Sequence, residues 1–228
     1  WGRADRNGLS GTASAVPTML VPVRSKRDTP ECRRRLTVRT QSSAVQTLVV
    51  VTIVVFLLES DAAGPLVSSF ALWPLQAGFM PWQLVTYAFL HASVLHLAFN
   101  MYGLWMFGRE LENLLGRRAL LQLYFASILT AGATQLLFTH LTGNVYPTVG
   151  ASGGVFGILL AYGIFFPNRI LILLFPPIPL PAWLFVTLYA GIELTLGVTG
   201  TQAGVAHFAH LGGMVGGYLI IRRWRRRS

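Results

Sequence analysis

Four polar side chains with the chemistry of a nucleophilic site lie within the most apolar stretches of the chain. His96 and Asn100 are four residues apart, Ser152 lies in a Gly-Ala-Ser-Gly sequence, and His210 follows 58 residues later. A serine hydroxyl becomes a nucleophile when a base within about 3 Å takes its proton, and histidine is the most common base. Ser152 and His210 therefore predict a nucleophile and its general base, and His96 and Asn100 are candidate hydrogen-bond donors to the resulting oxyanion.

The composition places these residues in a membrane protein. Of the 228 residues, 53% are hydrophobic and 11% are charged, whereas about 25% are charged in ordinary soluble domains. The uncharged stretches 62–108 and 119–168 far exceed the roughly 18 residues that indicate a membrane span. The net charge of +10 resides at the chain ends and in short connectors, which argues against a nucleic-acid partner. The single cysteine excludes an intrachain disulfide.

The apolar runs predict an all-α polytopic fold with six transmembrane helices. A proline- and tryptophan-rich segment at 62–88 predicts a structured interfacial loop between the first two. Four prolines between 176 and 181 delay the fifth span, either as helix terminators or as a re-entrant segment. The predicted spans are Ala44 to Leu58, about His91 to Phe107, Arg117 to His140, Ser152 to Phe166, Ala182 to Leu196 and Ala206 to Ile221.

The positive charges predict the orientation of these spans. All eighteen Lys and Arg residues fall before the first span, after the last or in the even-numbered connectors, so both termini are expected in the cytoplasm, with a bacterial plasma membrane as the expected location. Residues 1–40 are predicted to be a disordered basic tail, 41–222 the membrane domain and 223–228 a second basic tail. An organellar transit peptide is the alternative for the first tail, and Trp1 in place of Met suggests an altered or misassigned start.

Polar residues inside membrane spans generally mark functional sites. The second, fourth and sixth spans all run inward, so the residues near their starts reach a similar depth close to the external face. The fourth span carries Gly153 and Gly157, and the sixth carries Gly212, Gly213, Gly216 and Gly217. This small-xxx-small spacing allows helix backbones to approach closely. If the two glycine faces meet, Ser152 and His210 lie at the same contact.

Three motifs in this order resemble those of the rhomboid intramembrane serine proteases. The chain reads His96-Leu97-Ala98-Phe99-Asn100, Gly150-Ala151-Ser152-Gly153 and Ala209-His210-Leu211-Gly212. The resemblance covers about residues 42–222.

The resemblance implies a serine endopeptidase that cleaves transmembrane segments of single-pass proteins near the external face. It assigns Ser152 and His210 to a dyad without a carboxylate, and the oxyanion hole to His96, Asn100 and the Ser152 amide. Gly150 is expected to shape the turn, and Phe156 lies where some members place a tyrosine on the catalytic histidine. The resemblance also implies a loop in the outer leaflet, a fifth helix that gates lateral substrate access, and a preference for a small residue before the scissile bond.

No cofactor and no metal are expected, and the expected partners are transmembrane substrates and the lipid bilayer, with no nucleic acid. The sequence leaves the oligomeric state open.

The other polar residues are expected to have structural, interfacial or surface roles. The Ala-His-x-Gly context favours His210 over His207, which is expected nearer the water as a support or surface residue. His91 and His140 are expected at the interface, and Glu193 is expected to be structural or solvated rather than a third catalytic member or proton relay. Interfacial ion pairs are predicted for Arg109, Glu110 and Glu112.

Two non-proteolytic functions remain as alternatives. A metal or proton transporter would use the histidines and Glu193 as ligands or relay, but this function leaves Ser152 and the glycine motifs without a role. A rhomboid-like protein that binds membrane clients without cleaving them would be expected to lack Ser152 or His210, and this chain has both.

Overall fold

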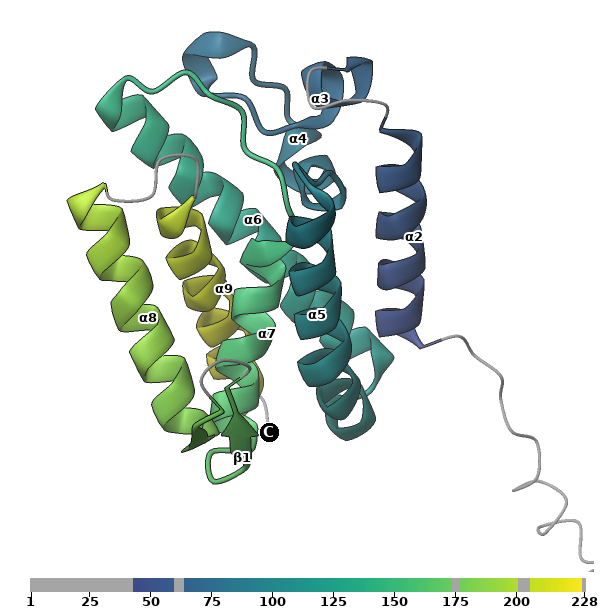
Figure 1. Ribbon diagram of the computed structural model, residues 1–228, viewed down its shortest axis with the longest axis vertical. Helices are drawn as coiled ribbons and strands as arrows, with labels where there is room; N and C mark the ends of the chain where they lie inside the picture. The colour runs from purple at the N-terminus through teal and green to yellow at the C-terminus, as the bar shows by residue number, and fades with distance from the viewer. Residues whose placement is uncertain (1–42, 60–63, 174–176, 201–205, 227–228) are drawn as a thin grey trace, which may run out of the picture. The chain divides into compact units, whose positions relative to one another are not determined.

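The structure is a computed structural model that describes residues 43–59, 64–173, 177–200 and 206–226. Residues 1–41 form one unit and residues 42–228 another, and the predicted N-terminal tail lies outside the described residues. Within the second unit, six long helices coincide with the predicted spans (Figure 1). They are α2 (Ala44–Leu58), α5 (Val94–Leu115), α6 (Arg117–Thr142), α7 (Ser152–Phe165), α8 (Ala182–Thr199) and α9 (His207–Arg225).

The segment between α2 and α5 is a structured loop, as predicted. Its elements are α3 (Pro65–Phe70), η2 (Leu75–Ala77), α4 (Gln83–Thr86) and η3 (Tyr87–Phe89). The buried Gln83 side chain accepts hydrogen bonds from the backbone N–H groups of Trp73 and Met80, at 3.2 and 3.1 Å. Trp82 donates its indole N–H to the carbonyl of Ser69 at 3.0 Å. These bonds satisfy backbone groups that an irregular loop would otherwise leave unpaired.

The proline-rich segment after α7 contains a hairpin that the sequence did not predict. Strand β1 (Ile170–Ile172) pairs antiparallel with β2 (Pro179–Pro181). Neither a plain helix terminator nor a re-entrant segment describes this pair. A two-stranded ladder tolerates proline because each of its strands has an edge that needs no N–H donor.

Four helices extend beyond their predicted ends, α6 and α8 by two and three residues and α5 and α9 by more. Helix α5 was expected to end near Phe107 and continues to Leu115, and α9 was expected to end near Ile221 and continues to Arg225. A helix need not end where its apolar run ends, because charged side chains can extend from its last turns into water. Arginines in the last turn of α9 also interact favourably with the negative end of the helix dipole.

Several of the helices are apolar enough to cross a membrane. Among the described residues, α6 and α8 meet both the length and the hydropathy expected of a span. The segments Gln83–Phe89 and Val94–Leu115, bent by 100° at the break between them, form a third candidate. The helices α2 and α7 are apolar but shorter, with 15 and 14 residues.

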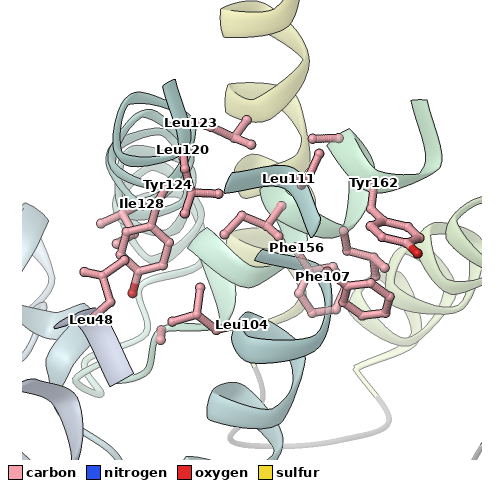
Figure 2. Packing of buried hydrophobic residues seen from close by; sticks show 14 of the residues in the cluster. Leu48, Leu104, Phe107, Leu111, Leu120, Leu123, Tyr124, Ile128, Phe156 and Tyr162 are labelled. Atoms are coloured by element: carbon pink, nitrogen blue, oxygen red, sulfur yellow. The ribbon is translucent and has the colours of Figure 1, made fainter. Parts of the chain in front are cut away.

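Helix α7 is the centre of this bundle and contacts α5, α6, α8 and α9. Figure 2 shows the buried side chains that α5, α6 and α7 contribute to the core, including Leu104, Tyr124 and Phe156. On the side facing α9, glycines replace side chains. A Cβ atom at Gly213 would overlap the backbone of Gly153, and one at Gly217 would lie 2.9 Å from the carbonyl oxygen of Gly157. The predicted contact between the two glycine faces is therefore present.

The side of the bundle with the predicted cytoplasmic connectors is held by acidic residues of α5. Glu110 forms an ion pair with Arg169 at 3.1 Å, so the ion pair predicted for Glu110 is present. Glu112 forms no ion pair within the part of the chain that the structure describes, and its carboxylate accepts hydrogen bonds from the N–H groups of Ala44 and Val45, at 2.6 and 3.1 Å. It thereby caps the N-terminus of α2, whose first N–H groups have no partner within the helix. Arg109 lies over the Trp105 ring at 5.0 Å and forms no ion pair with another described residue.

The glycine contact predicts a selective loss of stability. Gly213→Ala should lower the free energy of unfolding by about 1–3 kcal/mol, because the added methyl group has no space against the Gly153 backbone. Thermal unfolding in detergent measures the change. Gly191→Ala is the matched control, since nothing lies within 4 Å of its added Cβ. Equal melting temperatures for the two variants would contradict the close contact.

The helix order predicts which connectors are accessible from outside. In a Cys32→Ser background, Leu75→Cys and Val145→Cys should react with an impermeant thiol reagent added to intact cells, because both positions are exposed on the side opposite the basic connectors. Asn113→Cys should react only after the membrane is permeabilised. External labelling of the Asn113→Cys variant in intact cells would contradict the predicted orientation.

Candidate active site

The turn before α7 brings Ser152 to the start of the helix. Gly150 has φ +124, a conformation that side chains disfavour, and donates its N–H to the Tyr87 carbonyl at 2.9 Å. A Cβ atom at this position would also lie 2.7 Å from the imidazole of His96. Glycine is therefore required at position 150 both by the backbone conformation and by the approach of His96.

Ser152 and His210 lie within hydrogen-bond distance. The Oγ atom of Ser152 is 2.8 Å from Nε2 of His210, although the residues are 58 positions apart. The ring of Phe156 stacks on the His210 imidazole with centroids 4.3 Å apart and an angle of 7° between the planes. Tyr189 of α8 stacks on Phe156 at 5.2 Å. The plane of the imidazole is therefore held against an aromatic ring.

His96 and Asn100 lie one turn apart on one face of α5. The imidazole of His96 lies beside Gly150, in the turn that carries Ser152. Asn100 is buried and donates one amide hydrogen to the backbone carbonyl of His96 at 2.9 Å. The amide group has two hydrogens, so one bond to the helix leaves a second donor.

The structure brings to the site two further residues that were expected to have no part in catalysis. Glu193 was expected to be structural or solvated, and its 5% exposure excludes the solvated alternative and keeps the structural one. Its Oε2 atom lies 2.9 Å from Nδ1 of His210 and 2.6 Å from Nδ1 of His207. His207 is also 5% exposed, which fits the expected role of a support and not that of a surface residue.

The composition of α8 contains a signal that could have identified Glu193 as a candidate functional residue. It is the one charged residue in the 18-residue sequence of α8. An ionisable side chain in a membrane span indicates a functional site by default. Its partners could not be identified from the sequence, because they depend on the register between α8 and α9.

His91, which was expected at the interface, is 2% exposed, so its side chain is buried within the protein. Its Nε2 atom accepts a long hydrogen bond of 3.4 Å from the Ala151 N–H, and its ring meets His96 edge-on at 5.0 Å. His91 therefore supports the turn that carries Ser152. His140, in contrast, is exposed in the last turn of α6.

Three residues of this region have the donor types of a metal site. Glu193, His207 and His210 each offer one ligand atom, and these atoms lie within 4.8 Å of one another. Both imidazole Nδ1 atoms, however, lie at hydrogen-bond distance from the same carboxylate oxygen. A shared acceptor oxygen explains this arrangement with two N–H donors and without a metal ion.

Known proteins with similar sequences were compared with the chain. It is 33% identical over 135 residues to rhomboid protein 1, mitochondrial, of Saccharomyces cerevisiae, covering 58% of this chain and 38% of the relative. It is 33% identical over 151 residues to presenilin-associated rhomboid-like protein A, mitochondrial, of Danio rerio, covering 64% and 39%. It is 30% identical over 139 residues to rhomboid protease GluP of Bacillus subtilis, covering 60% and 25%. The matched part thus spans about a quarter to two fifths of the length of these relatives.

The family comparison covers the same part of the chain as the site. The Rhomboid domain matches residues 78–227, which include α5 to α9 and the three motifs. This match extends over more than half of the chain, and the helices, the apolar spans and the relatives agree with it. The chain is an integral membrane protein of the rhomboid family.

Proposed function

We propose that this protein is an intramembrane serine endopeptidase. It cleaves transmembrane segments of single-pass proteins near the external face of the membrane. The observation that carries the proposal is the 2.8 Å contact between Ser152 Oγ and His210 Nε2 at the meeting point of α7 and α9. The relative named as a rhomboid protease supports the same chemistry.

The proposed reaction begins with the transfer of the Ser152 proton to Nε2 of His210. The Oγ atom attacks the carbonyl carbon of the scissile peptide bond, and a tetrahedral intermediate with a negatively charged oxygen forms. The intermediate collapses to an acyl-enzyme as His210 gives its proton to the leaving amine. Water then attacks the ester with His210 again as the base, which releases the second product and restores Ser152.

The donors for the oxyanion are proposed to be the Ser152 N–H, His96 and Asn100. The N–H groups in the first turn of α7 lack intrahelical acceptors and form the positive end of the helix dipole. His96 and Asn100 add side-chain donors from α5. Donors that are fixed before the reaction stabilise the developing charge without the cost of reorganising solvent.

The orientation and the location are proposed from the distribution of the Lys and Arg residues. We place residues 41–222 in the membrane and the basic segments 1–40 and 223–228 in the cytoplasm, because bases accumulate on the cytoplasmic side. The bacterial plasma membrane remains a prediction, since the relatives are named from mitochondria as well as from a bacterium.

A second candidate function is a histidine-based metal site in a non-proteolytic membrane protein. The three ligand atoms of Glu193, His207 and His210 favour it. The two functions differ in their dependence on Ser152. Ser152→Ala should eliminate proteolysis but leave binding of Zn²⁺, measured by calorimetry on the purified protein, unchanged.

The proposed chemistry predicts which variants are inactive. Ser152→Ala and His210→Ala should abolish cleavage of a single-pass reporter in reconstituted vesicles and labelling by a fluorophosphonate. Asn100→Ala should lower the cleavage rate by up to about 10²- to 10³-fold, the cost of one oxyanion donor.

Ser127→Ala is the matched control for Ser152→Ala. Ser127 is a buried serine on α6 whose hydroxyl donates to the Leu123 carbonyl, so its loss should leave labelling and cleavage intact. A wild-type protein that binds the reporter but neither cleaves it nor reacts with the fluorophosphonate would instead support a client-binding protein.

The depth of Ser152 predicts where substrates are cut. A transmembrane helix shields its peptide bonds by hydrogen bonding, so the chain must unwind before Ser152 can attack. Gly and Pro weaken a helix interior by about 1 and 3 kcal/mol relative to Ala. Inserting Gly-Ala or Pro near the outer end of a resistant Leu-rich span should therefore permit cleavage, with a small residue before the cut.

Mass spectrometry of the products locates the cut, and Ser152→Ala is the control. The same insertion near the inner end should leave the span intact. Cleavage restricted to the cytoplasmic half would contradict the depth assigned to Ser152.

A further inference from the structure

A buried carboxylate lies on α8, the helix next to the one that carries His210. Glu193 is 5% exposed, whereas its neighbours Ile192 and Leu194 are about half exposed, at 50% and 51%. Burying an ionised carboxylate in an apolar environment is costly unless it is paired or hydrogen-bonded. The position of Glu193 therefore depends on the polar groups it contacts, and those groups are two imidazoles.

The contact with His210 determines which ring nitrogen carries the proton. An ionised carboxylate only accepts hydrogen bonds, so the 2.9 Å contact requires that Nδ1 of His210 is the donor. In the neutral ring the other nitrogen, Nε2, then has a free lone pair. That atom lies 2.8 Å from Ser152 Oγ. The tautomer that Glu193 selects is the one that can accept the serine proton.

The stacking partner of His210 cannot make this selection. Phe156 holds the imidazole plane within 7° of its own. A half-turn of the imidazole about χ2 preserves that plane but exchanges the positions of nitrogen and carbon atoms. The hydrogen bond to Glu193 distinguishes the two orientations, because only one of them presents Nδ1 to the carboxylate.

His207 positions the carboxylate in turn. Its Nδ1 atom lies 2.6 Å from the same Oε2 atom of Glu193. The two imidazole planes are nearly perpendicular, at 86° to each other. Because each donor nitrogen holds a proton toward the oxygen, these nitrogens are not available to a metal ion in this state.

We propose that Glu193 is a positioning residue that acts through His210, and that the site is a Ser152–His210–Glu193 triad with His207 as a support for the carboxylate. This inference rests on the proposed proteolytic function. It replaces the carboxylate-free dyad that the motifs imply with an arrangement in which α8 supplies the third group.

The test compares Glu193→Gln with wild type in the full chain. The amide can donate to Nδ1 of His210, which favours the tautomer with the proton on Nε2. We expect kcat for reporter cleavage in vesicles to fall by up to about 10⁴-fold with KM unchanged, as when a triad carboxylate becomes an amide. Glu112→Gln is the matched control: it alters another carboxylate with structural partners, at the cap of α2, and should leave kcat unchanged.

Nitrogen NMR of ¹⁵N-histidine-labelled protein supplies a readout that a purely structural role would not move. Signals are assigned with His207→Gln and His210→Gln. We expect His210 to carry its proton on Nδ1 in wild type and on Nε2 in Glu193→Gln. The variant Glu193→Asp, which keeps the charge on a shorter side chain, should recover part of kcat. His207→Gln should lose less activity than Glu193→Gln.

Wild-type kcat in Glu193→Gln, or a wild-type His210 with its proton on Nε2, would overturn the proposal. A wild-type spectrum that changes when EDTA is added would also overturn it, in favour of a metal site. If wild type neither cleaves the reporter nor reacts with a fluorophosphonate, the proposed function fails, and the NMR spectra still decide whether Glu193 sets the tautomer.

Discussion

The direct contact between the backbones of α7 and α9 sets the relative position of Ser152 and His210, the proposed nucleophile and base. Gly213 lies against the backbone of Gly153, which immediately follows Ser152, and His210 lies one helical turn before Gly213. Lipid offers no hydrophobic force between helices, so association depends on close van der Waals packing, and small residues permit it. A side chain at this contact would separate the helices and lengthen the Ser152–His210 distance.

Hydrogen bonds between polar side chains extend this arrangement to a third helix. Ser152 on α7, His210 and His207 on α9, and Glu193 on α8 are connected through 2.6–2.9 Å contacts. In a low-dielectric interior each such bond is stronger than in water, and an unpaired member is costly. The network therefore favours one register of α8 against α9, in a region where the outward side of α8 is covered by exposed apolar side chains such as Trp183 and Ile192.

The sequence predicts the parts of this structure that are encoded locally. Long apolar runs locate the six helices, and the three motifs identify Ser152, His210, His96 and Asn100 before any geometry is known. Contacts between residues far apart in the sequence are harder to predict from it. The burial of Glu193 and His207 depends on how α8 turns its faces toward α9, and the role of Glu112 depends on the start of α2 lying beside the end of α5. Prolines within β2 and shortly before it suppress the usual signal of a strand.

The location of Glu193 on α8 links the hydrogen bonding of His210 to the position of a whole helix. The Ser152–His210 contact lies between α7 and α9, but both contacts of Glu193 cross from α8 to α9. Moving α8 away from α9 would leave the first contact in place and break the other two. A molecule that binds better when α8 is displaced weakens the contacts of the Glu193 carboxylate. By thermodynamic reciprocity, these contacts oppose the binding of that molecule by the same free energy. The free energy of the hydrogen bonds to Glu193 thus contributes to an energetic threshold for inserting a polypeptide between α8 and its neighbours.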